Sequence, residues 1–154
     1  MNISKQIVVV TLGDVQYGFP IEQVNEIIRY IPPTQVPSSP IYYEGVINVR
    51  GKVHSVIDLR SFLGLEKKQP DKETKIIIAN ENRVGFIVDE VDMIIKPKEE
   101  EIDTNINLPV CFNNNHMTYM LKTNSNILYV LNMSSILNIN DLFPQASTQK
   151  MNLI

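Results

Sequence analysis

His54, Ser55 and Asp58 are the residue types of a hydrolytic triad, and they fall within one short segment of the sequence. In such a triad the histidine takes a proton from the serine hydroxyl, which then attacks a carbonyl carbon. The segment alternates apolar with polar residues and predicts a strand, in which His54 and Ser55 would point to opposite faces. No Gly-x-Ser-x-Gly turn, which would present a nucleophilic serine, occurs in the sequence. We therefore predict no catalytic residue and a chain that is not an enzyme.

Two acidic stretches are of the type that could bind a divalent cation, namely Asp89-Glu90 and residues 99–101. Adjacent residues in an extended segment diverge, and the glutamate run lacks the spaced oxygen ligands of a calcium loop. Both stretches are therefore predicted to be solvated. Cys111 is the only cysteine, and together with two distant histidines it does not make a zinc site. The sequence predicts neither a metal nor a cofactor.

The composition is that of a globular protein. The 154 residues are 44% hydrophobic and 20% charged, and the formal net charge is -3. Nucleic-acid binding needs clustered basic residues, so a nucleic-acid partner is not expected. No apolar run approaches the roughly 20 residues that cross a bilayer, so no membrane insertion is expected. We predict a cytoplasmic protein.

Short strands dominate the predicted secondary structure. The runs that predict strands are residues 6–12, 15–19, 46–50 and 53–57. Gly13-Asp14 and Gly51-Lys52 are predicted as the turns between the members of each pair. Residues 20–28 predict one or two helical turns that pass into a strand. Asp58 is predicted to cap a one-turn helix that Gly64 ends.

The second half of the sequence repeats the first. Residues 17–28 align with 84–95, and residues 53–63 align with 127–137. Halves of this size bury little core alone, so they should pack together along a shared apolar seam. The prediction is an all-β fold of two similar small β-barrels, with a few short helices. The approximate subdomains are 15–70 and 75–140, with the N-terminal strand and the C-terminal segment packing across.

Arg50 stands apart among the charged residues. It ends an apolar strand before a turn glycine, and Glu26 lies near the end of another apolar segment in the same half. We predict that the two form a partly buried ion pair. Arg60, on the predicted one-turn helix, is expected to be solvated.

Three runs resemble the CheW family of chemotaxis coupling proteins. They are Gly45-Val-Ile-Asn-Val-Arg-Gly51, Val56-Ile-Asp-Leu-Arg60 and Val84-Gly-Phe-Ile-Val-Asp89, within a similarity that extends from about residue 6 to residue 137. The resemblance implies two five-stranded β-barrels around a shared apolar core. It also implies a non-enzymatic adaptor that couples the cytoplasmic tip of chemoreceptors to the regulatory domain of a CheA-type histidine kinase. Such a protein would be recruited from the cytoplasm to membrane receptor arrays.

The resemblance also implies which residues contact the partners. The positions that match receptor-coupling positions of the family are Val24, Glu26, Ile27, Arg50, Val88 and Val91. The kinase-binding residues stay unassigned, on the second barrel around Tyr119 to Leu121, where the family commonly carries a Gly-x-Gly. The alternative function is a small β-barrel module that binds a ligand or nucleic acid. It would require a basic groove with stacking aromatic residues, whereas only 7% of the residues are aromatic.

Overall fold

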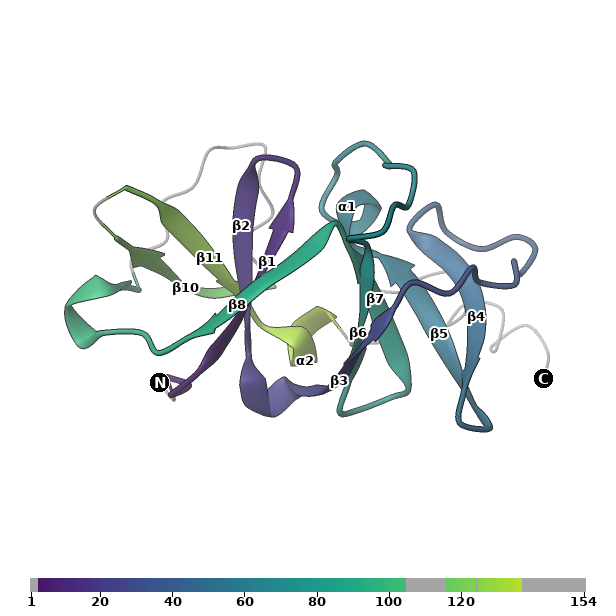
Figure 1. Cartoon of the computed structure of the whole chain (residues 1–154), viewed down its shortest axis with the longest axis horizontal. Helices are drawn as coiled ribbons and strands as arrows, with labels where there is room; N and C mark the ends of the chain where they lie inside the picture. Colours follow the sequence, from purple (N-terminus) through teal and green to yellow (C-terminus); the bar gives the residue numbers. More distant parts are fainter. Residues whose placement is uncertain (1–2, 105–115, 124, 137–154) are drawn as a thin grey trace, which may run out of the picture.

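The computed structural model describes residues 3–104, 116–123 and 125–136 and consists mainly of short β-strands. The strands form two sheets that stand next to each other, with α1 and α2 near their junction (Figure 1). The six-stranded sheet has the order β8-β1-β2-β11-β10-β9, and the five-stranded sheet has the order β3-β6-β7-β5-β4. The fold-class prediction of a mostly β protein with a few short helices is confirmed.

The six-stranded sheet is built from β1 (Ile7–Leu12), β2 (Val15–Pro20), β8 (Glu90–Ile95), β9 (Ile102–Asp103), β10 (Met117–Lys122) and β11 (Ile127–Leu131). The five-stranded sheet is built from β3 (Val24–Arg29), β4 (Tyr43–Val49), β5 (Lys52–Asp58), β6 (Lys75–Ala79) and β7 (Val84–Val88). The helices are η1 (Ile21–Gln23), α1 (Leu59–Phe62), η2 (Glu99–Glu101) and α2 (Met133–Ile136).

The two sheets repeat one topology, as the duplicated sequence predicts. When β3, β6, β7, β5 and β4 are replaced by their copies β8, β1, β2, β11 and β10, one strand order becomes the other, apart from the additional edge strand β9. Each sheet contains one parallel pair, β5 with β7 and β11 with β2, and these pairs are copies of each other.

The halves exchange hairpins. The β1–β2 hairpin from the start of the chain lies between β8 and β11, and the β6–β7 hairpin lies between β3 and β5. Residues 15–20 therefore belong to a sheet formed otherwise by the second half and β1. Sheet membership does not follow the predicted limits 15–70 and 75–140, and the division into subdomains stays a prediction.

Closed barrels are not confirmed. Among the described residues no ladder joins β3 to β4, or β8 to β9, so each sheet keeps two edges. The outer side of β4 instead receives a single bridge, Thr34 to Val46, from the connection that follows β3. That connection contains four prolines, which lack the N–H needed to extend a ladder.

The turn between β4 and β5 lies one residue earlier than predicted. Val49 pairs with Lys52, so the turn residues are Arg50 and Gly51 rather than Gly51 and Lys52. Both have positive φ, 50° and 82°, as a two-residue type I′ hairpin requires. The Asn48 side chain accepts a hydrogen bond from the Gly51 amide at 2.8 Å. This turn places Arg50 beyond the end of the strand, where its side chain can reach across the sheet.

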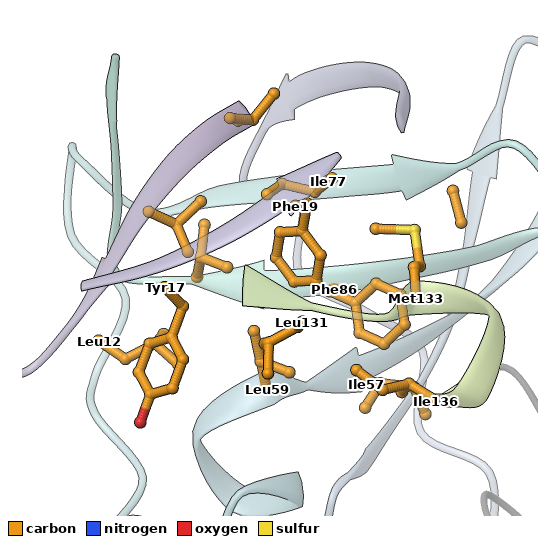
Figure 2. Packing of buried hydrophobic residues seen from close by; sticks show 14 of the residues in the cluster. Leu12, Tyr17, Phe19, Ile57, Leu59, Ile77, Phe86, Leu131, Met133 and Ile136 are labelled. Atoms are coloured by element: carbon orange, nitrogen blue, oxygen red, sulfur yellow. The ribbon is translucent and has the colours of Figure 1, made fainter. Parts of the chain in front are cut away.

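The main core lies between the sheets and is shared by both halves (Figure 2). Phe19 and its copy Phe86 stack there with ring centroids 6.3 Å apart. The helices add further copied positions, Leu59 with Met133 and Phe62 with Ile136. A predicted shared apolar seam is thus confirmed, and it holds the two sheets together.

Each sheet also carries a smaller apolar cluster on its other face. In the six-stranded sheet this cluster contains Ile7, Val9, Tyr119, Leu121, Leu128 and Val130. In the five-stranded sheet it contains Ile47, Val56, Ile76 and Ile78. Both faces of both sheets are therefore packed, which explains why a strand such as β6 is apolar at every position after Lys75.

Candidate docking site

The triad-type residues are not brought together. His54 is 8% exposed, and its Nδ1 lies 3.1 Å from the carbonyl oxygen of Lys52. The Ser55 hydroxyl lies 3.4 Å from the Tyr43 hydroxyl on the adjacent strand. Asp58 occupies the predicted N-cap position of α1, but its carboxylate accepts a hydrogen bond from the Ser61 hydroxyl at 2.7 Å rather than from a backbone amide. These partners give each residue a local structural role.

The described residues contain neither a cluster of metal ligands nor a helix that could span a membrane. No group of three or more His, Cys, Asp or Glu residues is placed to hold a metal ion within the described ranges. Within the same ranges no helix is both long enough and apolar enough to cross a membrane. Cys111 lies outside the described residues.

Arg50 and Glu26 meet at the surface. Nη1 of Arg50 donates to Oε1 of Glu26 at 2.7 Å, and the two side chains are 76% and 22% exposed. Arg50 belongs to the β4–β5 turn and Glu26 to β3, which are at opposite edges of the five-stranded sheet. The sheet must therefore curl until its edges approach each other at this end. An exposed pair with a single contact contributes little to the stability of the fold.

A second ion pair, which the sequence did not predict, is much better buried. Arg60 donates from Nε and Nη2 to the two carboxylate oxygens of Asp89 at 2.7 and 2.6 Å. The side chains are only 17% and 10% exposed. Asp89 also accepts a hydrogen bond from the Gly13 amide at 2.8 Å. The prediction that Arg60 and Asp89 are solvated was wrong.

The Arg60–Asp89 pair connects parts of both sheets. Asp89 lies between β7 and β8, Gly13 lies in the β1–β2 turn, and Arg60 lies on α1. Burial of the carboxylate raises the pKa of Asp89, but hydrogen bonds from Arg60 and Gly13 outweigh this, and the pKa ends below its ordinary value. The hydrogen bond to Asp89 raises the pKa of Arg60. The sequence did contain a signal for a structural role of Asp89. The duplication aligns it with another acidic residue, Glu22, in the first half.

The predicted receptor-coupling residues differ in accessibility. Ile27 is 38% exposed on β3, whereas Val24 and Val91 are half-buried against the main core. Val88 is 1% exposed and lies within that core. The most exposed apolar side chains of β8 are instead Met93 and Ile94, and Ile94 is the copy of Ile27 in the duplicated sequence.

Tyr119 and Leu121, at positions where the family commonly carries glycine, are both 1% exposed. They fill the smaller cluster of the six-stranded sheet together with Leu128 and Val130. The register between β10 and β11 shifts between Met117 and Tyr119. The larger side chains are therefore accommodated within the sheet's own packing, and neither is available at the surface.

The described residues form a duplicated two-sheet fold that carries exposed apolar and charged side chains on neighbouring elements, a kind of surface that suits docking. A family profile described as a CheW-like domain matches residues 6–141. The chain belongs to this family of chemotaxis coupling proteins.

The individual proteins that are similar to this chain include several CheW proteins. The chain is 34% identical over 130 residues to the chemotaxis protein CheW of Helicobacter pylori, a match that covers 82% of this chain and 77% of that protein. It is 37% identical over 106 residues to the chemotaxis protein CheW of Bacillus subtilis, covering 68% of each. Its structure is similar to the crystal structure of the scaffolding protein TtCheW from Thermoanaerobacter tengcongensis, with a TM-score of 0.75, 30% identity and coverage of 85% and 86%.

Proposed function

We propose that this protein is a non-catalytic scaffold that couples chemoreceptors to the regulatory domain of a CheA-type histidine kinase. Family membership supports the coupling function in chemotaxis. The observation that carries the proposal on this chain is the exposed Glu26–Arg50 pair on the edge strand β3, where the next residue, Ile27, presents an exposed apolar side chain on the other face. The protein would work from the cytoplasm and be recruited to receptor arrays.

The proposed receptor surface runs along the edge strands β3 and β8. Ile27 on β3 and Ile94 on β8 are 38% and 52% exposed, and Met93 is 54% exposed. In the view of Figure 1, α2 lies between these two strands. Exposed apolar side chains on both sides of a seam suit the apolar face of a receptor helix. The charged pair would fix its direction and register.

The remaining predicted residues support this surface from beneath. Val24 and Val91 pack against the main core under the exposed positions, and Val88 lies within it. Val88 would thus shape the seam without touching a partner. Each curled sheet, with strands from both halves, would act as a small barrel, and the hairpin exchange would keep the two sheets in a fixed relation.

The kinase contact is proposed on the six-stranded sheet without assigned residues, because Tyr119 and Leu121 are buried. Its existence is testable with the whole protein. A kinase regulatory domain from the same cell should bind the isolated chain in solution. Failure to bind at concentrations at which a relative binds its own kinase would contradict the scaffold function.

The receptor surface is tested by Ile27→Glu, which places a charge in the proposed apolar contact. We expect a receptor cytoplasmic fragment to bind this variant at least about tenfold more weakly, since a buried unpaired charge opposes association. Ile127→Glu is the matched control, because Ile127 is 49% exposed on β11, away from the proposed surface. Equal receptor binding by both variants would refute the placement on β3 and β8.

A further inference from the structure

The duplicated fold produces two hollows at corresponding places. One, of about 320 Å³, lies in the five-stranded sheet between the β4–β5 turn and the β6–β7 turn. The other, of about 710 Å³, lies in the six-stranded sheet between the copied turns, β10–β11 and β1–β2. We call them the first and the second hollow. Since both come from the same strand order, their shape follows from the fold, and any difference in chemistry follows from the residues placed there.

The first hollow is basic. Its lining includes Arg50, Lys52 and Arg83, with Glu26 as the single carboxylate, so the charged residues sum to three positive minus one negative, or two positive. This excess is found in a chain whose formal net charge is -3. His54 is also part of the lining. Three of the 14 basic residues of the chain therefore meet at this one site.

The second hollow lacks these cations. The duplicated alignment places Asn126 at the position of Lys52 and Gln16 at the position of Arg83, and both of these residues line the second hollow. Its only charged lining residue among the described part of the chain is Asp14. Amide side chains satisfy the same turns without charge, so the turns themselves do not require the basic residues.

We propose that the first hollow binds a phosphate group as its dianion. The charge excess of two matches that of a phosphate dianion, whereas a single carboxylate would leave one cation uncompensated. Arginine and lysine are the side chains that bind phosphate, the former through a planar set of N–H donors. The lining residues Asn25 and Asn82 supply further amide donors, whereas Asn80 donates from Nδ2 to the carbonyl oxygen of Glu22.

Arg50 is suited to this role despite its pairing. The ion pair with Glu26 uses Nη1, and the side chain is 76% exposed, so other guanidinium N–H groups remain for a ligand. A phosphate next to Arg50 would repel the Glu26 carboxylate and compete with it for the guanidinium. Occupation of the first hollow would thus change the charged pair at the surface.

The test follows backbone amide NMR signals of the full-length protein during titration with sodium phosphate, at constant ionic strength maintained with sodium chloride. The signals of Gly51, Asn82 and Arg83 should shift saturably, whereas those of Gly13 and Gln16 in the second hollow should not. Shifts of equal size in both hollows, or the same shifts with chloride alone, would overturn the proposal.

Substitutions make the test specific. The double variant Lys52→Gln/Arg83→Asn should bind phosphate at least about tenfold more weakly, since it loses two charge-assisted contacts. Asparagine is chosen at position 83 because φ there is +48°, a conformation that asparagine tolerates. Lys72→Gln/Lys96→Gln removes the same two charges at exposed sites that do not line the hollow and should bind normally. Unchanged affinity in the first variant would refute the site.

A second titration identifies the source of the phosphate. A short peptide with one phosphoserine is compared with inorganic phosphate and with the unphosphorylated peptide. Tighter binding of the phosphopeptide would assign the hollow to a phosphorylated side chain, and equal binding would assign it to free phosphate. If the unphosphorylated peptide bound as well as the phosphopeptide, the proposal would be wrong. None of these measurements uses a receptor or kinase, so their failure would leave the coupling function untouched.

Discussion

Arg50 and Arg60 both pair with a carboxylate, but the two pairs differ in solvent exposure and therefore in their contribution to stability. Arg50 is largely exposed and makes one contact with Glu26, whereas Arg60 makes two contacts with Asp89 in a partly buried position. Exposed pairs contribute little to folding, and buried pairs become costly to break because the remaining charge loses its partner. Arg60 is therefore a residue of the framework, whereas Arg50 is proposed as a residue of the docking surface.

This contrast predicts different effects on stability. Arg60→Ala should lower the free energy of unfolding by about 3 kcal/mol or more, since Asp89 is left buried and without its guanidinium. Arg50→Ala should lower it by about 1 kcal/mol or less. Urea denaturation of both variants and the parent protein measures the difference. Equal losses of unfolding free energy would mean that the two ion pairs contribute equally to stability, contrary to this prediction.

The ionisation of Asp89 should also make the free energy of unfolding depend on pH. Its folded-state pKa lies below the unfolded value of about 3.9, so its stabilising contribution is present above that value and is lost as the pH falls through the folded pKa. Burial raises the pKa of Asp58, so this residue has the opposite effect on the pH dependence of stability. Asp58 is unchanged in the variant Asp89→Asn. Between about pH 6 and pH 3, Asp89→Asn should therefore lose less stability than the parent protein does. Parallel pH dependences would contradict this assignment.

Single residues were predicted from the sequence to different degrees. The proximity of Glu26 and Arg50 was predictable because both lie near ends of apolar segments in the same half. Arg60 was not, since its partner is 29 positions away on a connection between strands and is positioned only by the complete fold. A charged side chain on a one-turn helix looks solvated when the layer that covers it is unknown.

At the scale of elements, Gly45 fixes how the proline-containing connection meets β4. Its φ is +126°, and a Cβ built there would overlap the backbone carbonyl of Thr34, the residue that bridges to Val46. Gly51 also has positive φ, but a Cβ there meets nothing within 4 Å. Gly45 therefore carries a steric constraint that Gly51 lacks.

We predict that Gly45→Ala destabilises the protein by clearly more than Gly51→Ala. The second change should cost about 1–2 kcal/mol, the penalty of a side chain in a left-handed conformation. The first adds a backbone overlap that can be relieved only by moving the bridge between Thr34 and β4. Thermal unfolding of both variants provides the comparison. If Gly45→Ala were the milder change, this close approach would not matter for stability.

The hairpins and the one-turn helix were predictable because their signals are local: apolar alternation, turn glycines and a capping residue. The position of the β4–β5 turn was missed by one residue, since Arg50 adopts the positive φ that sequence reasoning reserved for glycine. The exchange of hairpins between sheets was not predictable from these signals. It depends on pairing between distant segments, such as β2 with β11, which no local pattern specifies.

At the scale of the whole molecule, the exchanged hairpins make each sheet depend on both halves. The β6–β7 hairpin lies in the centre of the five-stranded sheet, so β3 and β5 have no direct contact through a ladder. A fragment of residues 1–72 should therefore be unfolded, because it lacks the central strands and half of the shared core. Amide NMR dispersion of the fragment tests this. A folded fragment would show that the first subdomain is independent of the second half.

The shared core also keeps the proposed receptor surface in register. Its exposed side chains come from β3 and β8, which belong to different sheets, and the stacked Phe19 and Phe86 lie in the core between these sheets. A rigid relation between the sheets would allow one receptor helix to contact both strands at once, as the proposed function requires. The scaffold function therefore follows from the whole fold rather than from any single residue.

The most direct measurement of this function is assembly of three components. A chemoreceptor cytoplasmic fragment, the cognate kinase and this protein are mixed, and the kinase recovered with the receptor is measured with and without the protein. We predict that kinase recovery requires the parent protein, is retained with Ile41→Glu, a change at a 74% exposed residue on the connection before β4, and falls with Ile27→Glu and Arg50→Ala, while these variants remain folded. Full recovery of the kinase without the protein would contradict the proposal that this chain couples receptor to kinase. Full recovery with both Ile27→Glu and Arg50→Ala would contradict the proposal that it does so through β3 and the β4–β5 turn.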